Sequence, residues 1–177
     1  RFRPENKASN WATGYNFPAV KAGLISKESI SSQNPVPMQA LVMNMRRPIF
    51  QDIRVRQALT AAYDFEWMNK TLFHGQYERL QSFFHGSELA ATGTPTDAEM
   101  QVLSPLLSKL EPMQRKAVLM EWQLPTSDGS GFNREGLLKA GQLLLDAGFY
   151  YKDMKLYQPD GKLAQIEVLM TGETMGR

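Results

Sequence analysis

The chain has no cysteine among its 177 residues. This absence excludes a disulfide, a thiolate nucleophile and a metal held by cysteine ligands. It does not identify a compartment, although a protein without thiols is at no disadvantage in an oxidising one.

Histidine is nearly as scarce, since His74 and His85 are the only two. A metal site would need a third ligand such as Glu78 or Glu88, and no carboxylate stands near either histidine at the usual ligand spacing. We therefore interpret both histidines as surface or loop residues, and we expect no metal and no cofactor.

Catalytic groupings are also missing. Gly129-Ser130-Gly131 is too short for the G-x-S-x-G turn of serine hydrolases, and it follows a proline-containing loop rather than a strand. Asp52 stands where a helix is expected to begin, so helix capping explains it. We predict that the chain is not an enzyme. The alternative is a hydrolytic domain of α/β type that uses Ser130 and His85.

Long apolar runs and clusters of one charge are absent as well. No apolar run approaches the roughly 20 residues that span a bilayer. The 20 basic and 18 acidic residues are scattered, so nucleic acid is not an expected partner. The chain starts at Arg1 and carries a strand-like run, Ile166–Met170, close to its end. We therefore expect it to be a piece of a longer protein.

The most informative stretch is Met38–Leu59. Its first part, Met38–Met45, is mostly apolar on both faces, which predicts a strand covered on both sides of a sheet. Pro48 ends this strand because proline cannot donate to a ladder. Asp52 then predicts the cap of a helix from Ile53, in which apolar residues recur at helical spacing.

Other segments extend this pattern. Helices are predicted from Asp64 to about Leu72, from Thr96 or Asp97 through Leu110 with a kink at Pro105, and from Asn133 to Gly148. Further strands are predicted at Leu24–Ile30 and Ile166–Met170, the last one fed by a hairpin turn at Asp160-Gly161. Together these elements predict an α/β or α+β lobe.

The stretch from Met43 to Asp64 resembles the extracellular solute-binding proteins of family 5, the dipeptide, oligopeptide and nickel type that serves bacterial ABC importers. The residues that carry this resemblance are Met43-Asn44, Pro48, Phe50, Asp52, Arg54-Val55-Arg56, Ala58-Leu59, Ala62 and Asp64. The segments Glu135–Phe149 and Gly161–Leu163 are similar to later family patterns. Asn10–Val20 and Ser87–Gly93 resemble the branch associated with microcin C and oligopeptide uptake in Gram-negative bacteria.

The resemblance implies a fragment of a two-lobe periplasmic-binding-protein fold of type II, peptide-binding class, with a mixed sheet flanked by helices. Residues 1–36 would end the first lobe and approach the hinge. Residues 37–177 would hold the hinge-crossing strand and the first half of the second lobe. Such proteins capture peptides between two lobes that close on a hinge, and they deliver them to an inner-membrane ABC permease from the periplasm.

The resemblance also implies where a ligand would be held. The positions that match ligand-contacting backbone near the hinge are Met38, Gln39 and Leu41, although a plain core strand explains these residues equally well. A permease-docking domain without ligand contact is a further alternative. We also expect exposed strand edges to promote self-association of the fragment.

Overall fold

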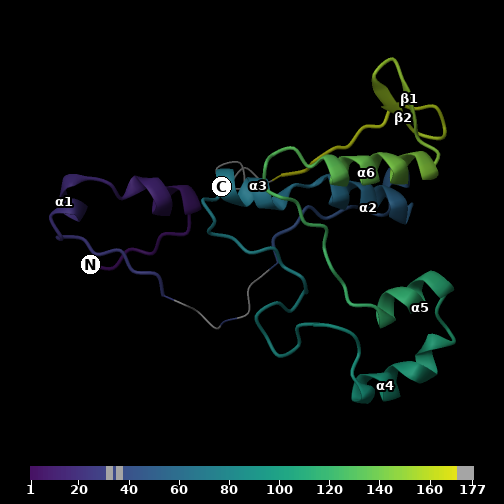
Figure 1. Cartoon of the computed structure of the whole chain (residues 1–177), viewed down its shortest axis with the longest axis horizontal. Coiled ribbons are helices and arrows are strands. Elements are labelled where there is room, and N and C mark those ends of the chain that lie inside the picture. Colours follow the sequence, from purple (N-terminus) through teal and green to yellow (C-terminus); the bar gives the residue numbers. More distant parts are fainter. Residues whose placement is uncertain (31–33, 35–37, 171–177) are drawn as a thin grey trace. The chain divides into compact units, whose positions relative to one another are not determined.

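The computed structural model describes residues 1–30, 34 and 38–170 (Figure 1). These residues fall into two compact units. The first unit comprises Arg1–Glu28, Leu41–Glu78 and the described residues from Pro125 onward, and the second comprises Arg79–Leu124 with the described residues of Ser29–Ala40.

The elements of the first unit are η1 (Asn10–Gly14), α1 (Pro18–Lys21), η2 (Pro48–Phe50), α2 (Ile53–Ala62), α3 (Phe65–Thr71), α6 (Arg134–Asp146), β1 (Tyr150–Lys152) and β2 (Lys155–Tyr157). Those of the second are α4 (Asp97–Leu107) and α5 (Pro112–Leu119).

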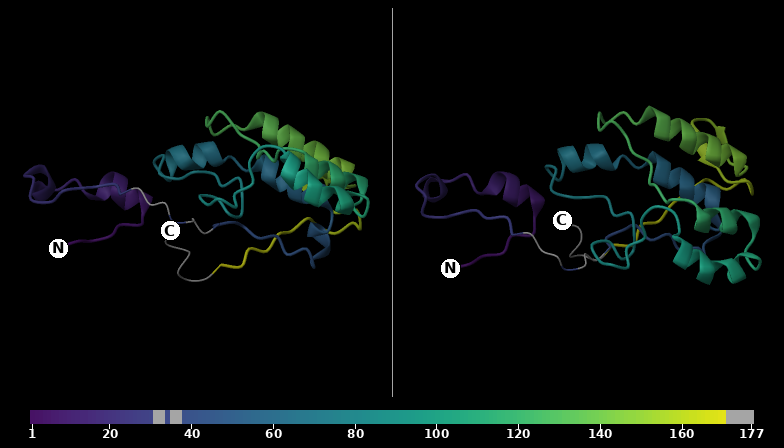
Figure 2. Two further views of the ribbon diagram at one scale, coloured as in Figure 1. Left: turned by 90° about the horizontal axis from the view of Figure 1, so that it is seen from below. Right: turned by 60° about the horizontal axis from the view of Figure 1, so that its bottom comes forward.

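The core of the first unit lies between α2 and α6, which run side by side in Figures 1 and 2. Ala58, Ala61 and Ala140 are buried where the two helices meet, and their small side chains let the backbones approach closely. Gly136 is part of this approach, because a Cβ atom there would clash with the main-chain oxygen of Ala61. The closest part of the contact is thus made by alanines and one glycine, and the partly buried Ala62, Leu143 and Leu144 pack around it.

Side-chain caps explain where the helices start. The Asp52 carboxylate accepts from the Arg54 N–H at 2.8 Å, Asp64 accepts from the Trp67 N–H at 3.0 Å, and Asn133 accepts from the Gly136 N–H at 3.0 Å. Thr96 and Glu99 form a reciprocal capping box at α4. These four predicted helix starts are confirmed.

The predicted strands are wrong for the described residues. Leu24–Ile30, Met38–Met45 and Ile166–Met170 contain neither helix nor strand there. A strand exists only when a second segment completes its hydrogen-bond ladder, and apolar composition alone supplies no such partner. The mixed sheet that we expected is therefore replaced, within the described residues, by the antiparallel pair β1–β2.

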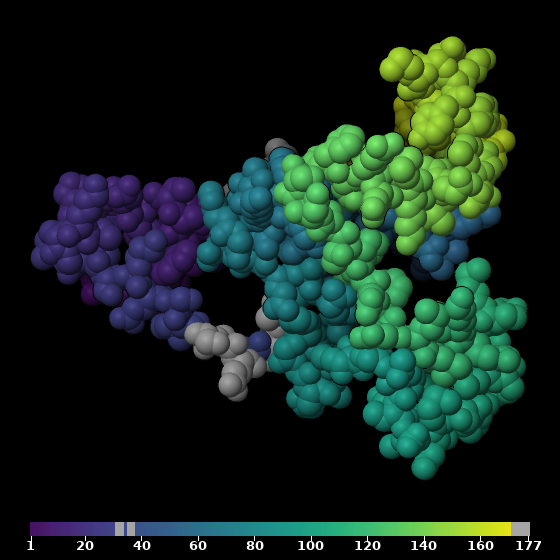
Figure 3. Space-filling model, viewed as in Figure 1, coloured from purple at the N-terminus to yellow at the C-terminus, as the bar shows by residue number. Residues whose placement is uncertain are grey.

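The β1–β2 hairpin pairs Tyr150 with Tyr157, whose rings stack at 5.6 Å. Its turn, Asp153-Met154, holds two non-glycine residues at positive φ, 49° and 59°. The predicted turn at Asp160-Gly161 also forms, and it leads to a single bridge between Tyr157 and Leu163. In Figure 3 the side chains of α6 and of this hairpin make a continuous surface.

The second unit contains only helices and loops in its described part. Pro105 lies inside α4, and the helix ends at Leu107 rather than at the predicted Leu110. No described residue of this unit is buried, and Val102, Met113 and Trp122 are each more than 60% exposed. Among all the described residues, no helix is long and apolar enough to cross a membrane.

Candidate functional site

The structure places the three predicted ligand contacts on an irregular segment. Met38 and Gln39 belong to the second unit, and Leu41 belongs to the first. All three are exposed, Leu41 to 73%. No hydrogen bond joins the main chain of residues 38–43 to any other residue that the structure describes. Within the described part of the chain, their N–H and C=O groups thus have no hydrogen-bond partner of the kind that a neighbouring strand would supply.

Within the first unit, the segment Leu41–Met45 ends in a turn and a cross-link. The N–H of Arg47 donates to the main-chain oxygen of Asn44 at 2.9 Å. The guanidinium of Arg47 then pairs with the Glu167 carboxylate at 3.1 Å, which ties this turn to the extended stretch around residue 167. Both side chains are mostly exposed, so this ion pair contributes little to the stability of the fold. Its main effect is to hold the turn at Arg47 next to Glu167.

The two arginines of the motif Arg54-Val55-Arg56 are structural. Arg54 pairs with Asp52 at 2.6 Å, and Arg56 donates to the main-chain oxygens of Phe50 and Gln51 at 2.6 and 2.9 Å. Val55 between them is buried. The hydrogen bond from Arg54 is the main reason why the pKa of Asp52 is lowered.

The loop after the second unit is attached to the start of α3. The hydroxyl of Ser127 lies 2.5 Å from Oδ1 of Asp64 and 3.2 Å from Oε2 of Glu66, and the Ser127 N–H donates to Glu66 at 3.1 Å. The other oxygen of Asp64, Oδ2, is buried and accepts no hydrogen bond within the described residues. One serine thus brings two carboxylates together.

A second attachment lies one turn further along α3. The side-chain amide of Asn69 donates to the main-chain oxygen of Tyr77 at 2.7 Å and accepts from the Tyr77 N–H at 3.1 Å. The ring of Phe73 meets that of Tyr77 edge to face at 4.7 Å. Neither this attachment nor the one at Ser127 has a local sequence signal, because each joins residues through tertiary contact.

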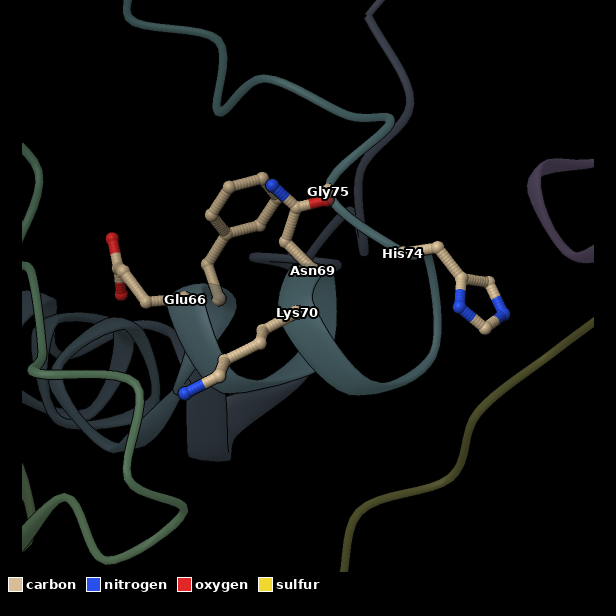
Figure 4. A pocket seen from close by; sticks show the side chains of 6 residues that line it. Glu66, Asn69, Lys70, His74 and Gly75 are labelled. Carbon is tan, nitrogen blue, oxygen red and sulfur yellow. The ribbon is translucent and has the colours of Figure 1, made fainter. Parts of the chain in front are cut away.

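An open groove of about 540 Å³ runs along α3 (Figure 4). The Lys70 ammonium makes no hydrogen bond or ion pair with the residues that the structure describes, and the Glu66 carboxylate is turned to Ser127. Figure 4 shows Glu66 and Lys70 on one side of the helix and His74 on the other. The groove can hold a polar group of a ligand. It is lined by Phe65, Glu66, Asn69, Lys70, His74 and Gly75.

The residues of the hydrolase alternative lie in different units. Ser130 belongs to the first unit, where its oxygen accepts from the Phe132 N–H at 3.2 Å. Its hydroxyl also hydrogen-bonds the Asp128 carboxyl, which is the main reason why the pKa of Asp128 is lowered. His85 belongs to the second unit. Among the described residues, no three His, Asp or Glu side chains gather in a way that could hold a metal.

Known proteins resemble the chain over most of its length. The model of "Bacterial extracellular solute-binding proteins, family 5 Middle" matches residues 2–175. A protein of Brucella melitensis biotype 1, named only as a binding protein, is 42% identical over 93% of this chain and 26% of its own length.

Two relatives from Agrobacterium fabrum carry a ligand in their names. "Probable peptide-binding protein YejA" is 37% identical over 99% of this chain and 29% of its own length. "Peptidoglycan-binding protein YepA" is 35% identical over 91% of this chain and 26% of its own length. The chain spans between a quarter and a third of these curated relatives. It belongs to the family 5 bacterial extracellular solute-binding proteins.

Proposed function

We propose that the chain is part of the substrate-binding component of a bacterial ABC importer, which captures peptides in the periplasm and delivers them to an inner-membrane permease. Membership of a solute-binding family and the name of the YejA relative support a binding role rather than catalysis. The lobes would close on a hinge around the peptide. Residues 1–36 would end the first lobe, and residues 37–177 would begin the second. We also retain the microcin C and oligopeptide branch as a proposal.

The observation that carries the proposal is that the main chain of residues 38–43 makes no hydrogen bond to any other described residue. An extended peptide can add to such a segment as a strand, because main-chain hydrogen bonds give affinity without demanding one side chain. Met38, Gln39 and Leu41 would then contact the ligand. Methionine suits a site that accepts varied side chains, since it is flexible and polarizable.

Calorimetry of the full-length protein with a peptide panel tests this proposal. The change Leu41→Pro removes one main-chain N–H, and we expect it to weaken peptide binding by about tenfold, the effect of one lost hydrogen bond. Val42→Ala is the matched control, because it trims a side chain that is 90% exposed and keeps every N–H. Equal affinity of both variants would show that this backbone does not contact the ligand.

The same panel separates the alternatives. It should include peptidoglycan stem peptides, because one relative is named for peptidoglycan. Binding of no peptide, with binding to the permease intact, would instead favour the docking domain. Cleavage of a peptide by the wild-type protein, lost in Ser130→Ala, would favour the hydrolase.

A further inference from the structure

The N-terminal segment of the first unit contains two aromatic rings that contact one cation. Trp11 lies in η1 and Tyr15 follows that element directly, and their ring centroids are 6.4 Å apart with 60° between the ring planes. The Nζ atom of Lys27 lies 4.6 Å from the ring centroid of Trp11 and 5.7 Å from that of Tyr15. It also donates to the main-chain oxygen of Trp11 at 2.6 Å. Two ring faces and one carbonyl oxygen thus bind a single ammonium group.

The chemistry of these contacts selects for an ammonium group and not for lysine in particular. The face of an aromatic ring attracts a cation through its quadrupole, most strongly when the ring is a tryptophan. The carbonyl oxygen of Trp11 requires an N–H donor, which a primary ammonium has and a quaternary ammonium lacks. The contacts therefore suit any primary ammonium group, and Lys27 supplies one from within the chain.

The two rings are held in place by groups other than Lys27. The hydroxyl of Tyr15 donates to Oε2 of Glu5 at 3.0 Å, and the other oxygen of Glu5 accepts from the Lys7 N–H at 3.1 Å. The N–H of Trp11 donates to the main-chain oxygen of Lys7 at 2.9 Å. Both rings are half-buried, and η1 is a π-helical turn, a rare conformation that is frequent at functional sites. The receiving side of the contact therefore does not depend on the cation.

Lys27, in contrast, belongs to a segment with few other contacts. The last main-chain hydrogen bond before it joins the Leu24 N–H to the oxygen of Ala19 at 3.0 Å. The main chain of residues 25–28 makes no hydrogen bond to any residue that the structure describes, and all four residues are exposed. An exposed segment without such bonds has low local stability. Lys27 can therefore leave the rings without breaking a main-chain hydrogen bond of its own segment.

We propose that Trp11 and Tyr15 form a binding site for the primary ammonium group of a ligand, and that Lys27 fills this site until the ligand displaces it. The ammonium can belong to a diamine, to a lysine side chain or to the amino end of a peptide. A group tethered by a short flexible segment competes at an effective concentration of about millimolar, so Lys27 lowers the apparent affinity for the ligand. This site goes beyond peptide capture at residues 38–43 and does not depend on it.

Fluorine NMR of the full-length protein labelled with fluorotryptophan tests the site, and the variant Trp11→Phe identifies the signal of Trp11. The protein is titrated with cadaverine, with Nα-acetyl-lysine amide and with alanine tripeptide amide, which carry the three kinds of ammonium. We expect at least one of them to shift the Trp11 signal in wild type. Lys27→Met should tighten the binding of that compound about tenfold or more, because the tethered competitor is gone.

Matched controls separate the site from a general effect of charge. Lys21→Met removes another exposed lysine of the same segment and should leave the affinity unchanged. The N-acetylated alanine tripeptide amide, which has no ammonium, should not shift the Trp11 signal. In the Lys27→Met background, Tyr15→Leu should weaken binding about threefold, the effect of one lost ring face, whereas Tyr15→Phe keeps the ring and should restore most of the affinity.

Two results would overturn the proposal. The first is a Trp11 signal that none of the three amines shifts, a result that wild type alone can give even if a variant fails to fold. The second is an equal change of affinity in Lys27→Met and Lys21→Met, which would show that Lys27 acts only through the net charge of the segment. Neither result would bear on peptide binding at residues 38–43, which calorimetry measures separately.

Discussion

Arg54, in the first turn of α2, donates from its guanidinium to the main-chain oxygen of Asp146, the last residue of α6. The same guanidinium pairs with Asp52, the cap of α2. A cation at the C-terminal end of α6 also complements the negative end of the helix dipole. One side chain therefore links the start of one packed helix to the end of the other, and this gives a physical role to an arginine of the family motif.

We expect Arg54→Met to lower the urea midpoint of unfolding by a few tenths of a molar or more, with little change in the slope. Methionine keeps much of the apolar stem but loses the hydrogen bonds to Asp52 and Asp146. The comparison is Lys139→Met, which removes an exposed cation from α6. Equal midpoints for the two variants would contradict a linking role for Arg54.

The pH dependence of stability should report the Asp52 charge. The folded state lowers the pKa of Asp52 below 3.8, first through the hydrogen bond from the Arg54 side chain and then through that from its N–H. Because the carboxylate is favoured in the folded state, its contribution is complete above the unfolded value and is lost as pH falls through the folded pKa.

Asp52→Asn isolates this charge, because asparagine caps a helix about as well as aspartate does. We expect wild type to be more stable than this variant at pH 7, by about 1 kcal/mol or less, the usual strength of a charge at a helix N-terminus. The difference should disappear below the folded pKa. Urea denaturation at a series of pH values measures it, and a difference that persists to the lowest pH would contradict the assignment.

Two glycines of α6 should respond oppositely to alanine. Gly136→Ala places a Cβ atom against the Ala61 oxygen and should destabilise the fold by about 1–3 kcal/mol, as overpacking does. Gly141→Ala meets nothing within 4 Å and should stabilise the helix by about 0.5–1 kcal/mol. Thermal unfolding of the two variants measures the contrast, and equal shifts of the same sign would refute the close approach.

The loop around Gly131 offers a similar comparison. Gly131→Ala suffers both from a positive φ of 84° and from contact with Trp67, whereas Gly23→Ala suffers only from a positive φ of 74° in open space. We expect both to lose about 1 kcal/mol to backbone strain, and Gly131→Ala to lose at least as much again to packing. Denaturant unfolding of both variants supplies the values. Equal losses of stability in the two variants would show that the loop around Gly131 can shift away from Trp67 without an energetic penalty.

Helix starts could be predicted from the sequence because capping is local. Asp52, Asp64 and Asn133 each lie within three residues of the N–H group that they accept from. The pattern of apolar residues after each cap then marks the helix. Helix ends were less well defined, as α4 shows by stopping at Leu107.

Strands and tertiary attachments could not be predicted in this way. Met38–Met45 has the composition of a buried strand, but a strand also needs a neighbouring strand to complete its hydrogen bonds. The local sequence pattern does not show which segment, if any, supplies that neighbour. The contact of Ser127 with Glu66 spans 61 residues, and nothing in a loop of Pro, Ser and Gly distinguishes Ser127 from Ser130. The ligand contacts at Met38, Gln39 and Leu41 stay a prediction.

The alanine seam between α2 and α6 has a mechanical consequence. Attraction between methyl groups has a short range, so a gap of only 0.5–1 Å already forfeits about a quarter to a half of it. The side chains of Ala58, Ala61 and Ala140 are too short to reach across such a gap, and only the partly buried Leu143 and Leu144 beside them are longer. A small displacement of α2 or α6 is therefore costly at the three alanines, and this part of the contact depends on accurate spacing of the two backbones.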